Sequence, residues 1–335
     1  MEKTLFIRLR LLGDIIFTIP AIQLYKNHYP DHYLYYVVEE KFKEIAELIP
    51  GIHKVLVVPH QMGPKEHMAF RKQVKSIGFN QVVDFHSGPK SALLTYLSGI
   101  KIRIGYRTPN RNYAYNRLTP RKIHDFPIHS TFNQAMLLEH LNIVIDQNIH
   151  SIPAYPPITI PAESVSEHVR DSLSKHKKVV IHLGAGNRFR DWGMKNFSSL
   201  IEKLVQDNCC IYLIGNTDIE KKRGEILENR FQVINFTGKL SIKDTLYLID
   251  GADIYMGFDS GPLHLASLTR TPIVAMYGPN IPEISGPWRK HNLTIIQVDL
   301  DCRPCSQRKC IYDTIRCING IEVDHIYEAV KNHIG

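Results

Sequence analysis

The sequence contains no apolar run that approaches the ~20 residues a helix needs to cross a membrane. Its first apolar segment, Thr4–Leu9, is interrupted by Arg8 and followed by Arg10. A secretion signal would need a continuous apolar stretch of roughly 7–15 residues at this place. We therefore expect a cytoplasmic protein.

Several catalytic signatures are also missing. There is no G-x-G-x-x-G dinucleotide fingerprint, no phosphate-binding loop followed by a lysine, no H-E-x-x-H zinc motif, no G-x-S-x-G nucleophile turn and no protein-kinase set. These absences speak against the dehydrogenases, nucleotide hydrolases, zinc proteases, serine hydrolases and kinases that carry such motifs.

Cysteine is scarce, with six residues in the chain. Two of them, Cys209 and Cys210, adjoin within an apolar run and are expected to be buried strand residues. The others form the pattern C-x2-C-x4-C-x6-C at Cys302, Cys305, Cys310 and Cys317. Such spacing could bind zinc or an iron–sulfur cluster. Because no paired C-x2-C…C-x2-C is present, a cysteine-rich structural loop without metal is the favoured interpretation.

The chain does contain a regular alternation of strand-length apolar runs and segments of helical period over its 335 residues. This alternation predicts parallel sheets covered by helices on both faces, and the length predicts two such α/β domains. Four prolines within Ser151–Pro161 indicate a linker, because proline cannot donate a backbone hydrogen bond. We place the domains at residues 1–155 and 156–335, with a last helix near Glu322–Asn332 that can pack back on the first domain.

The strands predicted for the first domain are Thr4–Leu9, Leu34–Val38, Val55–Val58, Gln81–Phe85 and Ile102–Tyr106. Those predicted for the second are Lys178–Leu183, Cys210–Ile214, Val233–Phe236, Ile254–Gly257, Ile273–Tyr277 and Thr294–Val298. Helices are expected between them, among them one over Ile15–Asn27 and a longer one over Thr131–Ile145.

The formal net charge of +8 is compatible with a merely basic surface, an anionic substrate, an anionic membrane surface or a nucleic acid. No nucleic acid is expected as a partner, because the basic residues are not interleaved with aromatic side chains that stack on bases.

Leu12-Gly13-Asp14 follows the first predicted strand and begins a helix. Asp14 can cap that helix, because its carboxylate accepts hydrogen bonds from free backbone N–H groups. It can also serve as a general base, because ligands of parallel sheets bind beyond the carboxyl ends of the strands. The two roles are compatible.

Three further segments follow strands of the second domain. His182-Leu183-Gly184-Ala185-Gly186-Asn187 offers two glycines and exposed backbone as a phosphate nest, with Arg190 and Trp192 just beyond. Asp259-Ser260-Gly261-Pro262-Leu263-His264 is typical of a helix start, whose free N–H groups favour an anion. Thr237 and Gly238 follow a third strand.

These residues resemble glycosyltransferase family nine, the bacterial lipopolysaccharide heptosyltransferases. The similarity rests on RLRLLGDIIFTI (8–19), VVDFHSGPKSALLTYLSGIKIRIGYR (82–107), VVIHLGAGNRFRDWGMKNF (179–197), FTGKLSIKDTLYLIDGADIYMGFDSGPLHLASL (236–268) and TPIVAMYGP (271–279). It covers nearly the whole chain in the expected order.

The resemblance implies a GT-B fold, with two Rossmann-like doubly wound domains facing a cleft. It implies an inverting, metal-independent transfer without a cofactor, commonly of heptose from ADP-heptose to an inner-core acceptor of lipopolysaccharide. Asp14 then matches the catalytic base. Donor binding falls to Gly184, Gly186, Asn187, Arg190, Trp192, Thr237, Gly238, Asp259, Ser260, Gly261 and His264.

At position 190 the chain has arginine where we expect lysine from the family, which keeps the charge and changes its geometry.

An anionic glycolipid acceptor suits basic residues of the first domain, and we assign Gly13, Lys65, Arg107 and Arg111 to it. The same charge could hold the enzyme peripherally at the cytoplasmic face of the inner membrane. The alternative function on the same fold is an epimerase of nucleotide sugars, and a basic nucleic-acid-binding protein is the more distant one.

Overall fold

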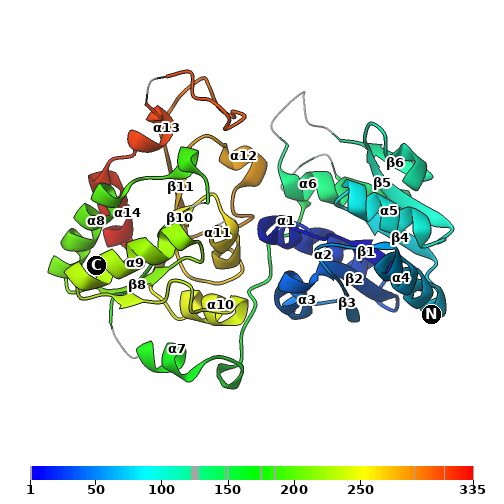
Figure 1. Cartoon of the computed structure of the whole chain (residues 1–335), viewed down its shortest axis with the longest axis horizontal. Coiled ribbons are helices and arrows are strands. Elements are labelled where there is room, and N and C mark those ends of the chain that lie inside the picture. The colour runs from blue at the N-terminus through cyan, green and yellow to red at the C-terminus, as the bar shows by residue number, and fades with distance from the viewer. Residues whose placement is uncertain are drawn as a thin grey trace. The chain divides into compact units, whose positions relative to one another are not determined.

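The computed structural model describes residues 2–121, 128–146, 148, 151–173, 176–184, 186–289, 291–312 and 314–334. The chain divides into two compact units, Met1–Tyr155 and Pro156–Gly335. In Figure 1 the first unit runs from blue to green-cyan and the second from green to red.

Within its described residues, the first unit has twelve α-helices and β-strands, apart from 3₁₀ segments. Their bounds are β1 Lys3–Ile7, α1 Leu12–Ile16, α2 Ile19–His28, β2 Tyr33–Glu39, α3 Lys43–Leu48, β3 Lys54–Val58, α4 Pro64–Ile77, β4 Gln81–Asp84, α5 Pro89–Leu97, β5 Ile102–Arg107, β6 Arg117–Pro120 and α6 Ser130–Ala135. Its six strands form one sheet in the order β3-β2-β1-β4-β5-β6, and all neighbours are parallel.

The second unit repeats this plan. Its elements are α7 Glu167–Ser172, β7 Lys178–His182, α8 Met194–Gln206, β8 Cys210–Ile214, α9 Asp218–Arg230, β9 Ile234–Asn235, α10 Ile242–Asp250, β10 Ile254–Phe258, α11 Gly261–Ala266, β11 Ile273–Tyr277, α12 Pro282–Ser285, β12 Leu293–Gln297, α13 Arg316–Asn319 and α14 Val323–Ile334. The sheet order is β12-β11-β10-β7-β8-β9, again parallel throughout.

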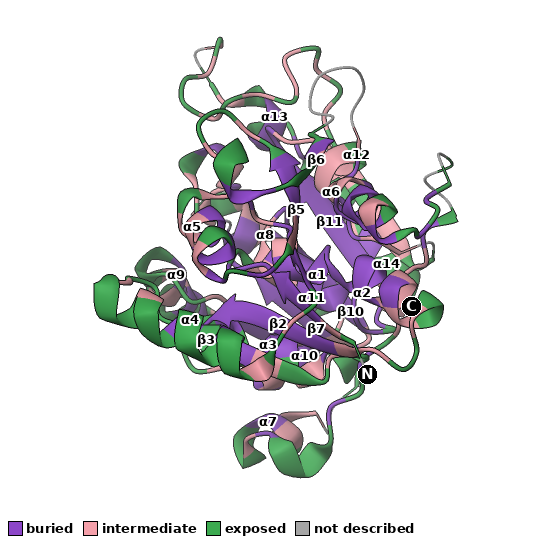
Figure 2. Cartoon of the chain, turned by 90° about the vertical axis from the view of Figure 1, so that its right-hand side faces the viewer, coloured by how far each residue is buried: buried purple, intermediate pink, exposed green. Residues whose placement is uncertain are grey.

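Helices cover both faces of each sheet. Successive side chains of a strand point to opposite faces, so each strand packs into a core on either side. In β1, Leu5 and Ile7 pack into one core with Phe70 of α4. On the other side, the ring of Phe6 lies 5.1 Å from that of Tyr25 in α2. Figure 2 shows the buried strands inside layers of helices whose outer faces are exposed. The predicted α/β fold with two doubly wound sheets is confirmed.

In each unit the strand order reverses direction next to the first strand. This switch point lies between β1 and β4 in the first unit and between β7 and β10 in the second. Loops that leave two neighbouring strands in opposite directions open a crevice there, which is where doubly wound sheets bind ligands. Asp14 follows β1, Arg190 follows β7 and Ser260 follows β10.

Some elements differ from the predicted ones. The helix expected over Ile15–Asn27 is two helices, and Pro20 lies in the first turn of α2, where its missing N–H costs nothing. The helix expected over Thr131–Ile145 is α6 followed by a 3₁₀ turn, Met136–Leu141. Strand β6 was not predicted. Helix α14 packs within its own unit on α8 and β10, and its packing on the first domain stays a prediction.

Candidate active site

Asp14 occupies the third position of α1, directly beyond β1. Its carboxylate accepts the backbone N–H of Leu11 at 3.1 Å, so it caps the helix from inside the first turn rather than as the N-cap residue. Its own carbonyl accepts from the Thr18 hydroxyl at 3.0 Å and from the Gln134 amide at 3.2 Å. These bonds fix the backbone that carries the carboxylate.

The strongest partner of Asp14 is Arg8, which was not predicted as a site residue. One guanidinium nitrogen of Arg8 lies 2.6 Å from the Asp14 carboxylate, and another donates to the carbonyl of Phe85. The Arg8 side chain is 7% exposed and that of Asp14 is 33% exposed. Burial raises the pKa of Asp14, but the charge and hydrogen bond of Arg8 and the N–H of Leu11 outweigh it, so the pKa lies below its ordinary value. Asp14 is therefore an ionised, partly open proton acceptor at neutral pH.

The loop after β4 adds His86 to the same crevice. Its Nδ1 lies 3.2 Å from the carbonyl oxygen of Arg10. Burial and then the charge of Arg8 lower the pKa of His86, which favours the neutral imidazole. A second polar cluster lies at the end of β2, where the buried carboxylate of Glu39 contacts His60 at 2.8 Å and Lys90 at 3.0 Å. These partners hold the pKa of Glu39 below its usual range despite burial.

The residues assigned to the acceptor lie at the carboxyl end of the first sheet. Gly13 is buried in α1, Lys65 is exposed in the first turn of α4, and Arg107 is the exposed last residue of β5. Arg111 is half-buried, and its Nε donates to the carbonyl of Ser87 at 3.0 Å. This bond from the Arg111 side chain to the backbone of Ser87 places Arg111 beside the loop after β4.

In the second unit, the loop after β7 carries Gly184, Gly186, Asn187 and Arg190, while Ala185 lies outside the described residues. Gly186 has a φ of +61°, a conformation that glycine adopts at little cost. The amides of Asn187 and the guanidinium of Arg190 both donate to the Gln307 side-chain oxygen, each at 3.0 Å. Gln307 belongs to the cysteine-rich segment, Cys302–Cys317, so hydrogen bonds to that segment hold the loop in place.

Asp259 directly follows β10 and contacts the loop after β7 through Arg190. Its carboxylate lies 3.2 Å from Arg190 and accepts from Asn280 at 2.9 Å, and its carbonyl also accepts from Arg190. His264 approaches the same carboxylate at 3.9 Å. A buried carboxylate would repel a phosphate, so Asp259 acts here by orienting the Arg190 guanidinium.

Ser260 is the N-cap residue of α11, and Gly261 is the first residue of that helix. The Ser260 hydroxyl donates to the carbonyl of Phe258 at 3.0 Å and lies 3.3 Å from Nδ1 of His182. The other ring nitrogen of His182 lies 3.4 Å from Glu220. Burial raises the pKa of Glu220, but His182 and the backbone N–H groups of Thr217 and Asn216 lower it to about 2. These contacts of His182 were not predicted, because the local pattern around Glu220 is that of a capping box with Thr217, which indicates a helix start and not a site.

Three of the residues predicted to bind the donor lie outside the loops at the switch point. Trp192 is 2% exposed, and its indole N–H donates to the carbonyl of Ile321 at 2.8 Å. We therefore assign it to the core and not to the donor. Thr237 and Gly238 follow β9, at the edge of the sheet and two strands from β7. Thr237 is buried, and its hydroxyl donates to the side-chain oxygen of Asn235 at 2.7 Å.

The four clustered cysteines are all free thiols, and all four line one cavity of about 50 Å³. Burial, followed by the neighbouring thiols, raises the pKa of Cys317 to about 11. Among the residues that the structure describes, no group of three or more His, Cys, Asp or Glu side chains is arranged to hold a metal ion.

The chain is thus built of two doubly wound domains, as GT-B proteins are, each with polar loops at the switch point where such sheets bind ligands. A model described as glycosyltransferase family 9 (heptosyltransferase) matches residues 67–316, well over half of the chain. The chain is therefore a glycosyltransferase and belongs to this family.

Similar proteins extend over nearly the whole length. Lipooligosaccharide heptosyltransferase 2 of Campylobacter jejuni is 23% identical over 333 residues, which cover 96% of this chain and 95% of the relative. A glycosyl transferase family 9 structure from Veillonella parvula superposes with a TM-score of 0.83 at 18% identity, covering 99% and 97% of the two chains. The E. coli ADP-heptose LPS heptosyltransferase II gives 0.78 at 16% identity, covering 100% and 98%.

None of the helices in the described ranges combines the length and apolar character that a bilayer crossing requires.

Proposed function

We propose that this enzyme transfers a heptose from ADP-heptose to an inner-core sugar of lipopolysaccharide, with inversion and without a metal. The names of the similar proteins support the donor and the acceptor class. The observation that carries the chemistry is the ionised Asp14 carboxylate, held by buried Arg8 at the switch point of the first unit. A fixed, partly exposed carboxylate in that position suits a general base.

In this proposal Asp14 takes the proton of the acceptor hydroxyl as its oxygen bonds to the anomeric carbon of the donor. The bond from that carbon to the diphosphate breaks, and ADP leaves with its added negative charge. The Arg190 guanidinium, oriented by Asp259, can stabilise this charge. The backbone of Gly184, Gly186 and Asn187 would add hydrogen bonds to the diphosphate. Ser260 and Gly261 would lie beside it, with His264 behind Asp259.

The acceptor is an anionic glycolipid in this proposal, and Lys65, Arg107 and Arg111 would meet its negative groups. Because such an acceptor is held in a lipid layer, we also propose that the enzyme works peripherally at the cytoplasmic face of the inner membrane. Its basic character supports this.

Asp14→Asn tests the base. General-base removal costs about 10²–10⁴-fold in turnover, while donor affinity should stay close to that of the native enzyme. Turnover is measured by ADP release with both substrates, and donor affinity by calorimetry with ADP. Loss of ADP binding together with turnover would instead indicate a purely structural role for Asp14.

Arg190→Ala tests the donor site. Loss of charge-assisted hydrogen bonds worth about 1.5–3 kcal/mol should weaken ADP binding roughly 10- to 150-fold. Arg188→Ala is the matched control, because that arginine is exposed and stacks on Phe189. An incubation with donor alone separates the two activities of the same fold: isomerised sugar without acceptor would indicate an epimerase and reject the transferase.

A further inference from the structure

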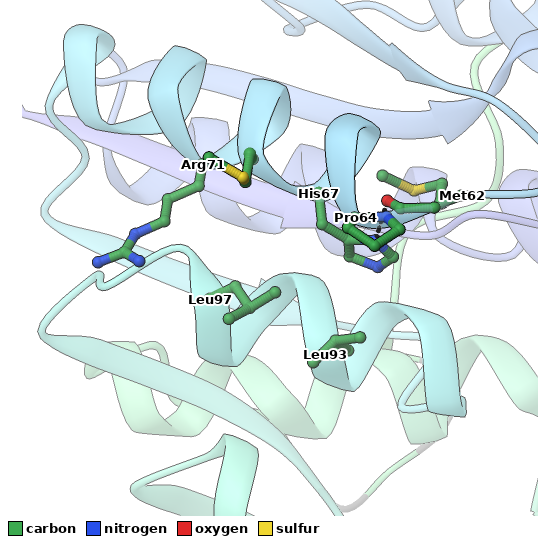
Figure 3. Close-up of a pocket in the computed structure, with 8 residues that line it drawn as sticks. Met62, Pro64, His67, Arg71, Leu93 and Leu97 are labelled. Atoms are coloured by element: carbon green, nitrogen blue, oxygen red, sulfur yellow. Dashed lines mark hydrogen bonds between the residues drawn. The ribbon is translucent and has the colours of Figure 1, made fainter.

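A groove of about 420 Å³ lies between α4 and α5 on the first unit, and its lining includes none of the residues assigned to catalysis or donor binding. Figure 3 shows how the two helices line it: Leu93 and Leu97 of α5 lie along one side, and His67 projects from α4 near Pro64 and Met62 at one end. Arg71 reaches past Leu97 at the other end. The groove is therefore mostly apolar and ends in a cation.

The surface around the groove exposes large apolar side chains. Met68, which lines the groove, is 72% exposed. Tyr96, one residue before Leu97, is 51% exposed, and its ring lies 5.5 Å from that of Tyr113, which is also exposed. Burying such side chains in water-free surroundings is favourable, and tyrosine is enriched where proteins meet the membrane interface.

The same face is strongly basic. Helix α4 carries exposed cations at Lys65, Arg71, Lys72 and Lys75. Its single acidic residue is Glu66, whose carboxylate accepts the backbone N–H of Gly63 at 2.7 Å and so serves as a cap. In the described part of the chain none of the four cations forms an ion pair with a carboxylate. Their charge is available to an external anion.

We propose that this α4–α5 face docks on an anionic lipid bilayer. An acyl chain lies in the groove between Met68, Leu93 and Leu97, while Arg71, Lys72 and Lys75 contact lipid phosphates. Apolar and aromatic side chains beside a row of cations are the chemistry of helices that bind in the plane of the membrane surface. The inference deepens the proposed function, since it names the surface by which an enzyme with a lipid-linked acceptor reaches that acceptor.

Binding of the full chain to vesicles tests the proposal. We expect it to sediment with phosphatidylcholine vesicles that contain phosphatidylglycerol, and much less with phosphatidylcholine alone. The double substitution Lys72→Gln/Lys75→Gln should weaken this binding roughly 30-fold, because each cation at an anionic surface contributes about fivefold. Lys195→Gln/Lys222→Gln is the control, since it removes two exposed cations of the second unit.

The apolar contact is tested by Met68→Ser, with Ile226→Ser as the control, since Ile226 is 55% exposed on α9. Only the Met68 variant should lose affinity for anionic vesicles. A Met68→Trp variant should in addition be quenched by lipids with brominated acyl chains. Equal losses in the controls, equal binding to neutral vesicles, or no quenching of the tryptophan would each overturn the proposal, and the last would favour a protein partner for this face.

Turnover with a core-sugar acceptor that has no acyl chains separates this inference from the proposed function. The Lys72→Gln/Lys75→Gln variant should keep native turnover on it. Native turnover without vesicle binding would reject the docking face alone, whereas vesicle binding without any transfer would reject the transferase.

Discussion

Replacement of Arg8 by methionine removes the cation that pairs with Asp14 and keeps an apolar chain of similar length in the buried space. The two side chains lie 2.6 Å apart, with exposures of 7% and 33%. Breaking a buried ion pair from one side costs about 3–5 kcal/mol. Because a third of the Asp14 side chain is exposed, water screens part of this ion pair. We therefore expect the free energy of unfolding of the first unit to fall by about 2–4 kcal/mol. A loss of ~3 kcal/mol lowers Tm by roughly 6–12 °C for a unit of this size.

The sign of the pH effect follows from the same contact. In the native fold the pKa of Asp14 lies below its ordinary value of 3.8, although burial alone would raise it. The ion pair therefore stabilises the fold above the unfolded pKa, and this stabilisation is lost as pH falls through the folded pKa. Without Arg8, the raising effect of burial is opposed by the N–H bond of Leu11 and the charge of His86, and the pKa of Asp14 rises. The acidic limb of the kcat/KM profile should then move to higher pH.

The assay is a pH–rate profile of ADP release between pH 4 and 8, together with thermal melting over the same range. Arg8→Lys is the matched variant, because it keeps the charge and loses the planar fork. It should show a smaller Tm loss and an acidic limb closer to the native one. An unmoved acidic limb in Arg8→Met, or a Tm difference from the native protein that does not shrink toward low pH, would refute the assignment of Arg8 as the group that positions and ionises Asp14.

Three other outcomes are expected. Gly184→Ala should destabilise the second unit by about 1–3 kcal/mol in denaturant unfolding, because the added Cβ would lie 2.5 Å from the Glu220 carboxylate. The same destabilisation in a Glu220→Ala background would contradict this cause. The pKa of Glu220 is lowered from 4.5 to about 2, so its ionised form should add about 3 kcal/mol to the free energy of unfolding above pH 4.5. This stabilisation is lost as pH falls toward 2, and acid unfolding of Glu220→Gln should lack that loss. Cys317, with a pKa of about 11, should stay unalkylated by iodoacetamide at pH 8 while Cys310 reacts, as peptide mass spectrometry would show; equal labelling of both would contradict the burial of Cys317.

Periodicity was enough to predict most strands and helices. Cys210–Ile214 and Ile273–Tyr277 are apolar throughout, as strands buried on both faces must be, and both occur with the predicted bounds. Strand β6, Arg117–Pro120, has no such pattern, because it is a short edge strand with exposed ends. The helix predicted from Thr131 is shorter than its apolar period, since its second half winds as a 3₁₀ turn.

The candidate site was predictable only where one segment carried the signal. Asp14, Arg190 and Ser260 each follow a strand, so a local pattern indicates them. Arg8 directly follows the apolar strand β1, and its role depends on how the chain turns back to bring Asp14 to it. Glu220 meets His182 only because β7 and β8 are neighbours in the sheet, and strand order cannot be read from periodicity.

The two six-stranded sheets share one winding order, and each is assembled entirely from strands of its own half of the chain. Because each half forms all the strand pairs of its own sheet, it can be inherited as a unit. The boundary between the halves lies in the proline-rich segment around residue 156. Gene fusions that pair this first half with the second half of another family member should consequently yield folded hybrids. If the first unit binds the acceptor and the second the donor, as proposed above, such exchange would give a lineage a new sugar donor while it keeps its acceptor.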